Sequence, residues 1–465
     1  MRCFNIALPL MCLLLAGCMV GPDYHSPISS TSSTVAYQDI SAQWWTLFHS
    51  PQMNDLVQAG LKNSPTLDAA TATLKQAQEN LNAQIGSSLL PAINAQASGE
   101  RQRGISGSSG QPTSTTSTAS ANIFNLYNAS VNISYTLDVF GGARRQIEGL
   151  QAQVDYQNFE LEAARLTLTS NIVTTAITVA SLQEQIRVTQ EIIQSQTEQL
   201  NIVQKQLRLG GASGSDVLTQ ESELATTRAS LPPLKQHLAQ SQDALAVLVG
   251  NFPSDFKLPQ FNLNNVQLPK HIPISLPSQL VRQRPDIRAQ EALLHAACAQ
   301  VGVATANLYP QITLSGAYGG SALSTANLFS PANIAWNYGG TFLQPLFHGG
   351  ALRAQRRAAV DAFDATAAQY RQVVLQGFQN VADSLQALQN DKDALQSEQL
   401  AESAAYRSLN ITQKQYKLGG VSYLNLLTAQ RQYKTAKINL IQAKATQLSD
   451  AAALFQALGG GWWHK

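Results

Sequence analysis

The chain repeats a set of landmarks in the same order, which restricts it to a fold with two similar halves. Leu209-Gly210-Gly211-Ala212-Ser213 recurs 209 residues later as Leu418-Gly419-Gly420-Val421-Ser422. Phe140-Gly141-Gly142 is echoed by Phe347-His348-Gly349-Gly350. Ordered landmarks at a nearly constant offset indicate one structural unit duplicated in tandem.

The duplication predicts the domain organisation of the chain. Each repeat is expected to contain a helix, a β-hairpin, a long helix and a returning helix. The predicted segments are 1–17 as a lipoprotein signal peptide, 18–52 as a lipid-anchored tether, 53–250 as the first repeat, 251–277 as a proline-rich linker, 278–460 as the second repeat and 461–465 as a C-terminal tail.

The N-terminus has the pattern of a bacterial lipoprotein signal. Arg2 precedes an apolar run that ends at Leu15-Ala16-Gly17-Cys18, and this run is too short to span a membrane. The tetrad resembles a lipobox, which predicts cleavage before Cys18 and a covalent lipid on it; a coincidental cysteine after an ordinary signal is the alternative. Met19, in place of an acidic residue, implies by resemblance sorting to the outer membrane.

Composition excludes several classes of protein. A net charge of +2 is too small to suggest nucleic acid as a partner. Charged residues make up 13% of the chain, about half the usual share, so the polar surface consists mainly of uncharged side chains. Such a surface suits a weakly charged, water-filled conduit. Beyond Leu15 no apolar run approaches the length of a spanning helix, so any membrane crossing is predicted to use strands.

Four strands are predicted from alternating patterns. From Tyr127 to Asp138 apolar and polar residues alternate without exception, and a weaker partner lies at about 92–103. The second repeat alternates likewise around 312–318 and 334–342. Four strands cannot close a membrane barrel, which needs at least eight, so an oligomer is required. Three copies would supply 12 strands, although this argument does not fix the number at three.

Long helices fill most of the remaining sequence. A first helical region is expected at about 53–90, opened by an aromatic group that includes Trp44 and Trp45. Apolar residues at intervals of seven predict rods at 143–208 and 352–418, each about 100 Å long, with coiled-coil packing. Returning helices are expected at about 214–250 and 422–458. Pro232-Pro233 is expected to kink or interrupt the first of these.

Each rod is predicted to end in a tight turn. The glycines of Leu-Gly-Gly can supply the left-handed residue of a helix C-cap. Ser213 and Asp216 have the spacing of a capping box that starts the returning helix. Each repeat therefore contains a helical hairpin with a tip.

Several motifs together resemble one family. They are Trp44-Trp45-x-x-Phe48, Leu276-Pro277-Ser278, Arg284-Pro285-Asp286-Ile287-Arg288, Tyr309-Pro310, Pro345-Leu346-Phe347 and Tyr416-x-x-Gly419-x-x-Ser422. Over nearly the whole mature chain they are similar to the outer-membrane factors of tripartite export systems. The resemblance is to the lipoprotein branch typified by OprM and NodT, with TolC as a more distant relative.

This resemblance implies the fold class and the partners. The fold is mainly α with a transmembrane β part: a tandem-duplicated unit that forms a homotrimer. The trimer would combine a 12-stranded outer-membrane β-barrel with a long periplasmic α-helical coiled-coil barrel. The implied partners are a periplasmic adaptor (membrane fusion) protein, an inner-membrane pump of the RND, ABC or MFS type, and outer membrane lipid. The implied location is the outer membrane of a Gram-negative bacterium, with the chain lipid-anchored and extending into the periplasm.

The resemblance also implies two sets of site residues at the hairpin tips. The adaptor-docking set is Leu209, Gly210, Gly211, Ser213, Leu418, Gly419, Gly420 and Ser422. The periplasmic gate set is Asp216, Tyr416, Val421, Asn425 and Thr428. Asp216 has a simple helix cap as its alternative role, and the two roles are compatible. Three copies of Asp216 near an axis would form an acidic ring that favours cations.

The chain departs from the family pattern at the gate. Related channels often carry aspartates where this chain has Asn425 and Thr428, and TolC-like proteins carry an arginine where it has Val421. An ion-pair lock is therefore not expected. Hydrogen bonds and apolar packing are expected to hold the gate instead.

These observations predict a passive exit duct for efflux of small toxic compounds or drugs. A type I protein-secretion channel is a close variant. A structural lipoprotein that spaces the envelope layers would explain the rods but not the strands. An enzyme is not expected, because the chain has no nucleotide-binding loop, nucleophile motif or close pair of histidines, and no metal or cofactor beyond the lipid on Cys18 is expected.

Overall fold

The computed structural model describes residues 19–27, 40–105, 121–256, 261–269 and 283–464. The chain forms two compact units, each described by itself below. Unit 1 comprises Met1–Pro27, Lys75–Tyr156 and Glu291–Gln369, and unit 2 comprises Ile28–Leu74, Gln157–Gln290 and Tyr370–Lys465. Each unit draws on both halves of the sequence, so the predicted boundaries of the repeats stay a prediction. Cys18 and the signal peptide lie outside the described residues.

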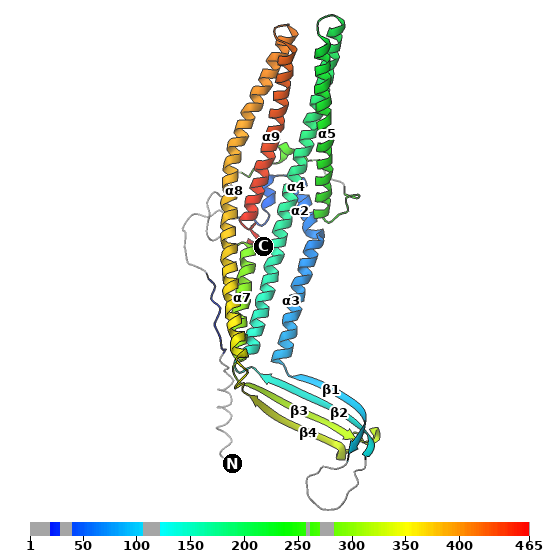
Figure 1. The fold of residues 1–465 in the computed structure, drawn as a ribbon, viewed down its shortest axis with the longest axis vertical. Coiled ribbons are helices and arrows are strands. Elements are labelled where there is room, and N and C mark those ends of the chain that lie inside the picture. Colours follow the sequence, from blue (N-terminus) through cyan, green and yellow to red (C-terminus); the bar gives the residue numbers. More distant parts are fainter. Residues whose placement is uncertain (1–18, 28–39, 106–120, 257–260, 270–282, 465) are drawn as a thin grey trace, which may run out of the picture. The chain divides into compact units, whose positions relative to one another are not determined.

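Unit 1 contains one four-stranded sheet (Figure 1). Its strands are β1 (Ala92–Ile105), β2 (Ala121–Leu137), β3 (Gln311–Ala322) and β4 (Ile334–Leu343), and two 3-10 turns, η3 (Thr325–Asn327) and η4 (Pro331–Asn333), lie between the last two. The strands are antiparallel in the order β1-β2-β3-β4, so the two predicted hairpins lie side by side. β1 and β4 are the open edges.

A short N-terminal segment packs in unit 1 beside α4 (Gly142–Arg208) and α7 (Pro285–Ala306). The buried Arg145 holds it, because its guanidinium pairs with Asp23 at 2.6 Å and with Glu148 at 2.8 Å. The ring of Tyr24 stacks on His295 at 4.3 Å between centroids. A Cβ on Gly302 would lie 2.8 Å from the side chain of Arg145, so this contact requires glycine. Residues 19–27 are thereby fixed to the helices.

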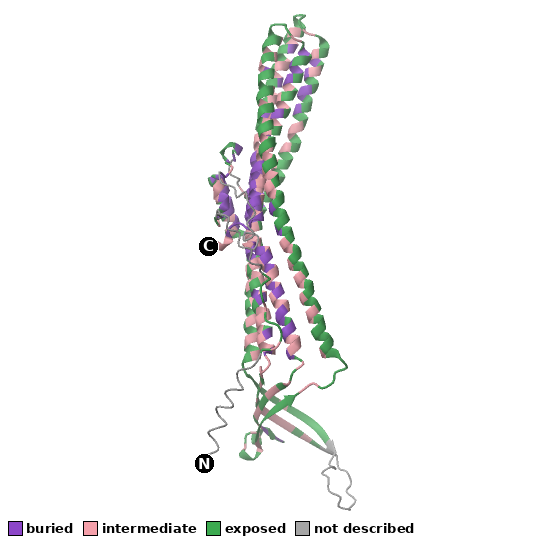
Figure 2. Cartoon of the chain, turned by 90° about the vertical axis from the view of Figure 1, so that its left-hand side faces the viewer, coloured by how far each residue is buried: buried purple, intermediate pink, exposed green. Residues whose placement is uncertain are grey.

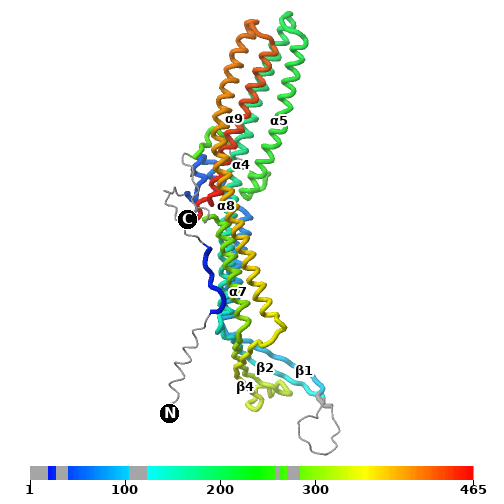
Figure 3. Tube along the Cα trace, turned by 60° about the vertical axis from the view of Figure 1, so that its left-hand side comes forward, coloured from blue at the N-terminus to red at the C-terminus, as the bar shows by residue number. Residues whose placement is uncertain are grey.

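The long helices confirm the duplication. α4 and α8 (Ala351–Lys417) begin 209 residues apart and end 209 residues apart, and so do the returning helices α5 (Gly214–Leu248) and α9 (Tyr423–Ala457). The heptad residues Ile172, Val179 and Val381 are fully buried in unit 2. The two hairpins end in loops at the same end of unit 2 (Figures 1 and 3).

Two predictions about helices need correction in part. The region at 53–90 is not one helix: α2 (Pro51–Asn63) and α3 (Pro65–Leu89) are separated by Ser64, which is extended because the following proline disfavours helical geometry there. Pro232-Pro233 does not interrupt α5, since the helix continues through both prolines, and the alternative of a kink there stays a prediction. Both prolines are exposed, so water can solvate the carbonyls that lose a partner.

The main core lies in unit 2. The 3-10 turn η1 (Trp44–Phe48) buries Trp44 and Phe48, which pack on Phe455 of α9. The aromatic group near the start of the chain therefore serves as part of the hydrophobic core. The turns η2 (Leu263–Asn265) and η5 (Trp462–His464) lie near the same core. Figure 2 shows that the strands of unit 1, in contrast, are mostly exposed or half-buried.

Candidate functional site at the hairpin tips

Both tips use the same backbone geometry. After α4 the amide of Gly211 donates to the carbonyl of Gln206 at 2.8 Å, and that of Gly210 donates to Leu207 at 3.0 Å. After α8 the amides of Gly420 and Gly419 donate to the matching carbonyls of Gln415 and Tyr416, at 2.8 and 3.0 Å. This is the Schellman pattern, and the φ angles of Gly210 (80°) and Gly419 (75°) confirm the predicted left-handed caps.

Each tip presents one leucine to solvent. The side chains of Leu209 and Leu418 are each 87% exposed, next to the left-handed glycines. No heavy atom lies within 4 Å of where a Cβ on Gly210 or Gly419 would be. The tips are therefore open, convex surfaces with an apolar side chain at the same place on each.

The first tip starts its returning helix with the predicted capping box. The amide of Asp216 donates to Ser213 Oγ at 3.2 Å, and the amide of Ser213 donates to Asp216 Oδ2 at 2.9 Å. The hydroxyl of Ser213 also donates to the same carboxylate oxygen at 2.7 Å. The cap role of Asp216 is confirmed. Its gate role stays a prediction.

The second tip lacks that box. Ser422 stands at the N-cap of α9, but its side chain makes no capping hydrogen bond. Asn425, at the position of Asp216, is exposed, and its backbone N–H donates to the carbonyl of Ser422 at 3.1 Å. Val421 is half-buried, and Thr428 donates its hydroxyl to Leu424 within α9 at 2.9 Å. Among the described contacts, these residues therefore serve their own hairpin.

Two tyrosines of the second hairpin reach across to the first. Tyr416 donates its hydroxyl to Gln206 Oε1 at 2.9 Å, and Tyr423 donates to Gln220 Oε1. Gln220 is in turn fixed to the carbonyl of Gln196, to which its amide donates at 3.1 Å. The two tyrosine rings meet at 5.8 Å between centroids.

Burial favours the protonated, hydrogen-donating form of both hydroxyls further. It is the first cause that raises the pKa of Tyr416, and the charge of Asp216 adds to it. Burial also raises the pKa of Tyr423, with Tyr416 and Asp216 as further causes. The charge of Asp216 thus acts on Tyr416, but the hydroxyl of Tyr416 bonds to Gln206 and not to that carboxylate.

An ion pair continues the contact between the hairpins. Arg431 Nε on α9 donates to Glu223 Oε2 on α5 at 2.7 Å, and the Glu223 side chain is almost fully buried. Lys434 Nζ donates to Thr227 Oγ1 at 3.1 Å, and burial lowers the pKa of Lys434. We call these four cross-hairpin contacts the seam. Its pairs are Tyr416–Gln206, Tyr423–Gln220, Arg431–Glu223 and Lys434–Thr227.

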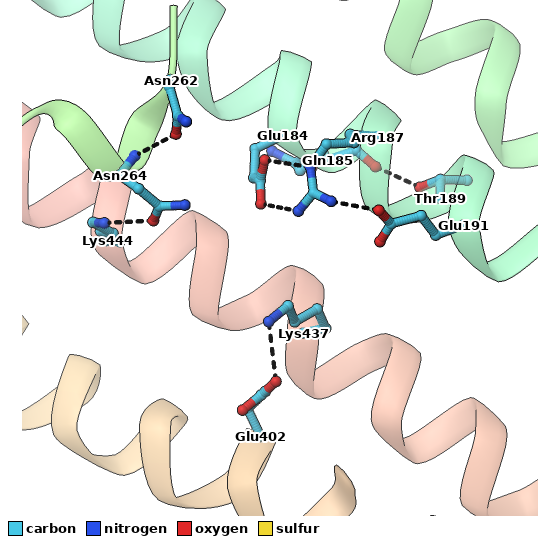
Figure 4. Close-up of polar contacts among 10 residues, drawn as sticks. All are labelled: Glu184, Gln185, Arg187, Thr189, Glu191, Asn262, Asn264, Glu402, Lys437 and Lys444. Atoms are coloured by element: carbon cyan, nitrogen blue, oxygen red, sulfur yellow. Dashed lines mark hydrogen bonds and ion pairs between the residues drawn. The ribbon is translucent and has the colours of Figure 1, made fainter.

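Below the seam, polar contacts tie α9 to its neighbours (Figure 4). Lys437 Nζ donates to Glu402 Oε1 of α8 at 3.1 Å, and Lys444 Nζ donates to Asn264 Oδ1 at 3.0 Å. On α4, Arg187 lies between Glu184 and Glu191 and contacts both. The hydrogen bond from Arg187 lowers the pKa of Glu184. Charged side chains on three elements hold this region, whereas at the tips the only such contact described above is the Asp216 carboxylate in the first cap.

The family model for outer membrane efflux proteins matches residues 56–251 and 276–460. The chain belongs to the outer membrane efflux protein family. This membership assigns it to efflux and to the outer membrane. The two matched stretches lie in the two halves of the duplicated chain.

Relatives of this efflux protein match it over almost its whole length. The pyoverdine export outer membrane protein OpmQ of Pseudomonas aeruginosa is 29% identical, with 98% of this chain and 97% of that protein covered. The probable outer membrane lipoprotein SilC of Salmonella typhimurium is 27% identical, with 97% of each chain covered. The solved outer-membrane channel OprN has a TM-score of 0.87 at 28% identity, covering 96% of this chain and 100% of that one. The predicted combination of a tandem helical channel and a β part is thereby confirmed.

Sequence analysis missed most of the seam of this efflux protein. Gln206, Gln220, Glu223 and Arg431 belong to no motif, and only Tyr416 was named. Glu223 has no local signal in the sequence, because its neighbours one turn away on α5, Gln220 and Thr227, are polar. Its partner Arg431 lies on α9, which is distant in sequence.

A carboxylate pair was also missed. Asp391 of α8 lies beside Asp450 of α9, with which the protonated Asp391 forms a hydrogen bond, and its Oδ2 is buried. Burial, followed by the neighbouring Asp450, raises the pKa of Asp391 to about 6. The signal was present, because Asp391 follows the heptad residue Leu388 by three positions and so shares the core-facing stripe of α8.

Two kinds of feature are absent from the described residues. No group of three or more histidine, cysteine and acidic side chains in these parts of the chain could hold a metal ion. Within the same ranges, no helix is both long and apolar enough to span a membrane.

Proposed function

We propose that three copies of this chain form the outer-membrane exit duct of a tripartite efflux pump. Small organic compounds pass through it without energy input from the duct itself. The strands form a 12-stranded barrel, and the helical hairpins form a periplasmic tunnel. A periplasmic adaptor joins the hairpin tips to an inner-membrane pump.

The observation that carries this proposal is the two-faced sheet with open edges. One face is apolar in successive rows from Leu137, paired with Ile312, to Tyr127, paired with Gly99. These rows are ten residues apart along β2, which gives a band about 26 Å tall at about 3.4 Å per residue and a tilt of about 40°. That height matches the hydrocarbon core, and open edges are not tolerated there, so further copies of the sheet must close it.

The opposite face suits the wall of an aqueous conduit. Along β1 and β2 it carries Asn94, Gln96, Asn132 and Ser134, with Glu100 as the single charge on this face of the described strands. A wall of this kind offers hydrogen bonds without strong charge selection. It supports passive conduction of varied cargo, in keeping with relatives named for export of pyoverdine, antibiotics or toluene.

We assign adaptor docking to the tips. Leu209, Gly210, Gly211 and Ser213 form the first contact surface, and Leu418, Gly419, Gly420 and Ser422 form the second. Two matching exposed leucines on rigid caps offer an adaptor equivalent apolar anchors on both hairpins.

We assign the gate to the adjacent residues Asp216, Tyr416, Val421, Asn425 and Thr428. The seam supports a gate based on hydrogen bonds, since Tyr416 reaches the other hairpin through Gln206. Val421, Asn425 and Thr428 carry no charge, so they add no ion pair to it.

We assign a covalent lipid to Cys18. The clamped segment that starts at Met19 supports this role, because it would hold the adjacent anchor beside the sheet of unit 1. A lipoprotein relative, SilC, agrees with it. The Cys18→Ala variant is expected to lose the lipid yet still insert, since the strands supply most of the membrane affinity.

Native mass spectrometry and planar-bilayer recordings on the purified, lipidated protein test the proposal together. The expected result is a complex of three chains that conducts ions with little selectivity. A monomer, or a trimer that never conducts when its tips are loosened, would contradict the duct.

A further inference from the structure

Two arginines stand on the apolar face of the sheet. Residues of β1 alternate between the faces, so Arg101 and Arg103 share a face with Ile93 and Ala95. They are the only charged residues on that face within the described strands, and both are exposed. Glu100 precedes Arg101 on the same strand and is the single charge of the opposite face within the described strands.

Their height places them at the edge of the apolar band. Arg101 pairs with Asn125 and Arg103 with Ile123, whereas the last row of the band pairs Gly99 with Tyr127. The arginines are therefore one and two rows beyond a band about 26 Å tall. β1 begins at Ala92, just after α3, so these rows are at the end of the strand remote from the helices of unit 1.

We propose that Arg101 and Arg103 bind the phosphate groups of a phosphorylated lipid in the outer leaflet. The inference rests on the membrane insertion of the sheet under the proposed function, and it adds a specific lipid contact that the duct does not require. On that orientation, the end of β1 remote from the helices faces the exterior.

The free energy of a cation at different depths of the bilayer supports this placement. A cation on the lipid-facing surface is destabilising at the midplane and nearly neutral at the interface, where its head group can reach phosphate. Arginine suits phosphate because its planar guanidinium donates two parallel hydrogen bonds. Neither side chain has a carboxylate within 4 Å in the described part of the chain, so both charges are available to an external anion.

The test compares lipid retention by the intact trimer in neutral nanodiscs. The probes are lipid A with two phosphates, the form with one phosphate, and phosphatidylcholine, counted by native mass spectrometry. The variant Arg101→Gln with Arg103→Gln is compared with Glu100→Gln, which changes a charge on the same strand but on the other face. A third variant, Arg101→Lys with Arg103→Lys, keeps the charge and removes the two-pronged geometry.

The wild-type chain is expected to retain the two-phosphate lipid most strongly. The double glutamine variant should lose this preference by roughly ten- to thirtyfold, because each basic residue near an anionic surface contributes about one factor of five. The lysine variant should fall between, and Glu100→Gln should match wild type. High salt should weaken the preference.

Equal retention by the glutamine variant in an inserted trimer would overturn the inference and leave the duct intact. Full competition by millimolar inorganic phosphate would assign the site to free phosphate instead of lipid, and so overturn it. Dissociation of the trimer in the glutamine variant alone would assign the arginines to contacts between copies. Failure of the wild-type chain to insert would overturn the proposed function first.

Discussion

The two hairpin tips have the same backbone and different side chains. Both end their long helix with the same pair of hydrogen bonds around a left-handed glycine, Gly210 or Gly419. The first tip then starts its returning helix with a capping box at Ser213, whereas Ser422 makes no such bond. Duplication therefore preserved the geometry of the turn, and the side chains around it diverged.

The two hairpins have different roles in the hydrogen bonds of the seam. In the seam every donor comes from the second hairpin: Tyr416, Tyr423, Arg431 and Lys434. Every acceptor comes from the first: Gln206, Gln220, Glu223 and Thr227. At the positions 209 residues before the two tyrosines the first hairpin has Leu207 and Gly214, so it could not donate in return. The hairpins became complementary partners instead of equivalent copies.

The largest effect is expected where the tips are alike. Gly419→Pro should abolish export while the protein still reaches the outer membrane. Proline holds φ near −65°, whereas Gly419 has 75°, and it removes the amide that donates to Tyr416. Drug susceptibility of cells that carry the variant measures the effect, and Gly210→Pro tests the matching tip.

Gly419→Ala is the control, because it keeps the amide and costs only about 1–2 kcal/mol for the left-handed backbone. No atom crowds a Cβ there. Unchanged export by Gly419→Pro would remove the tip from the docking surface.

Breaking the ion pair of the seam should have the next largest effect. Arg431→Met leaves the buried carboxylate of Glu223 without its partner, at a cost of about 1–3 kcal/mol. Amide hydrogen exchange should become faster in the tip halves of α5 and α9. The double variant with Glu223→Gln should recover part of the protection, and an equal loss in both would argue against a buried unpaired charge as the cause.

Removing the N-cap serine should destabilise the two returning helices to different extents, and the expected effect is smaller than that of breaking the ion pair. Ser213→Ala should cost about 1 kcal/mol, because it removes the cap of α5. Ser422→Ala should cost much less, because that side chain makes no capping bond. Hydrogen exchange in the first turns of α5 and α9 measures both. Equal effects would mean that the difference between the caps has no energetic weight.

The smallest effect concerns pH. In the folded chain Asp391 holds its proton up to about pH 6, against a usual pKa of 3.8. The folded state thus binds this proton more tightly than the unfolded state, so the contribution of Asp391 to stability is largest at low pH and falls as pH rises between about 4 and 6. Asp391→Asn should remove this fall, on the order of 1 kcal/mol.

Thermal unfolding of wild type and Asp391→Asn at pH 4.5 and 7 measures that difference. The first hairpin has Leu182 and Ser241 at the corresponding positions, and Leu182→Asn is the matched control. If the stability of wild type relative to Asp391→Asn increased from pH 4.5 to pH 7, the result would contradict the assigned direction.

The sequence predicted the periodic features well. The heptads located α4 and α8, and the Leu-Gly-Gly motifs located both caps, because each depends on local spacing. The break at Ser64 was missed although Pro65 signals it, since the apolar pattern continues across it. The pairs of the seam were out of reach, because Arg431 and Glu223 are 208 residues apart and neither shows a local signal.

Photo-crosslinking at Leu209 and at Leu418 in cells tests the central claim most directly. Each site lies on an identical cap and is equally exposed. The exposed Leu400, on α8 away from the tip, is the control position. Both tips are expected to capture the same periplasmic adaptor, and Leu400 is not. Capture only of this chain's own copies from both tips, while cargo is exported, would contradict this expectation.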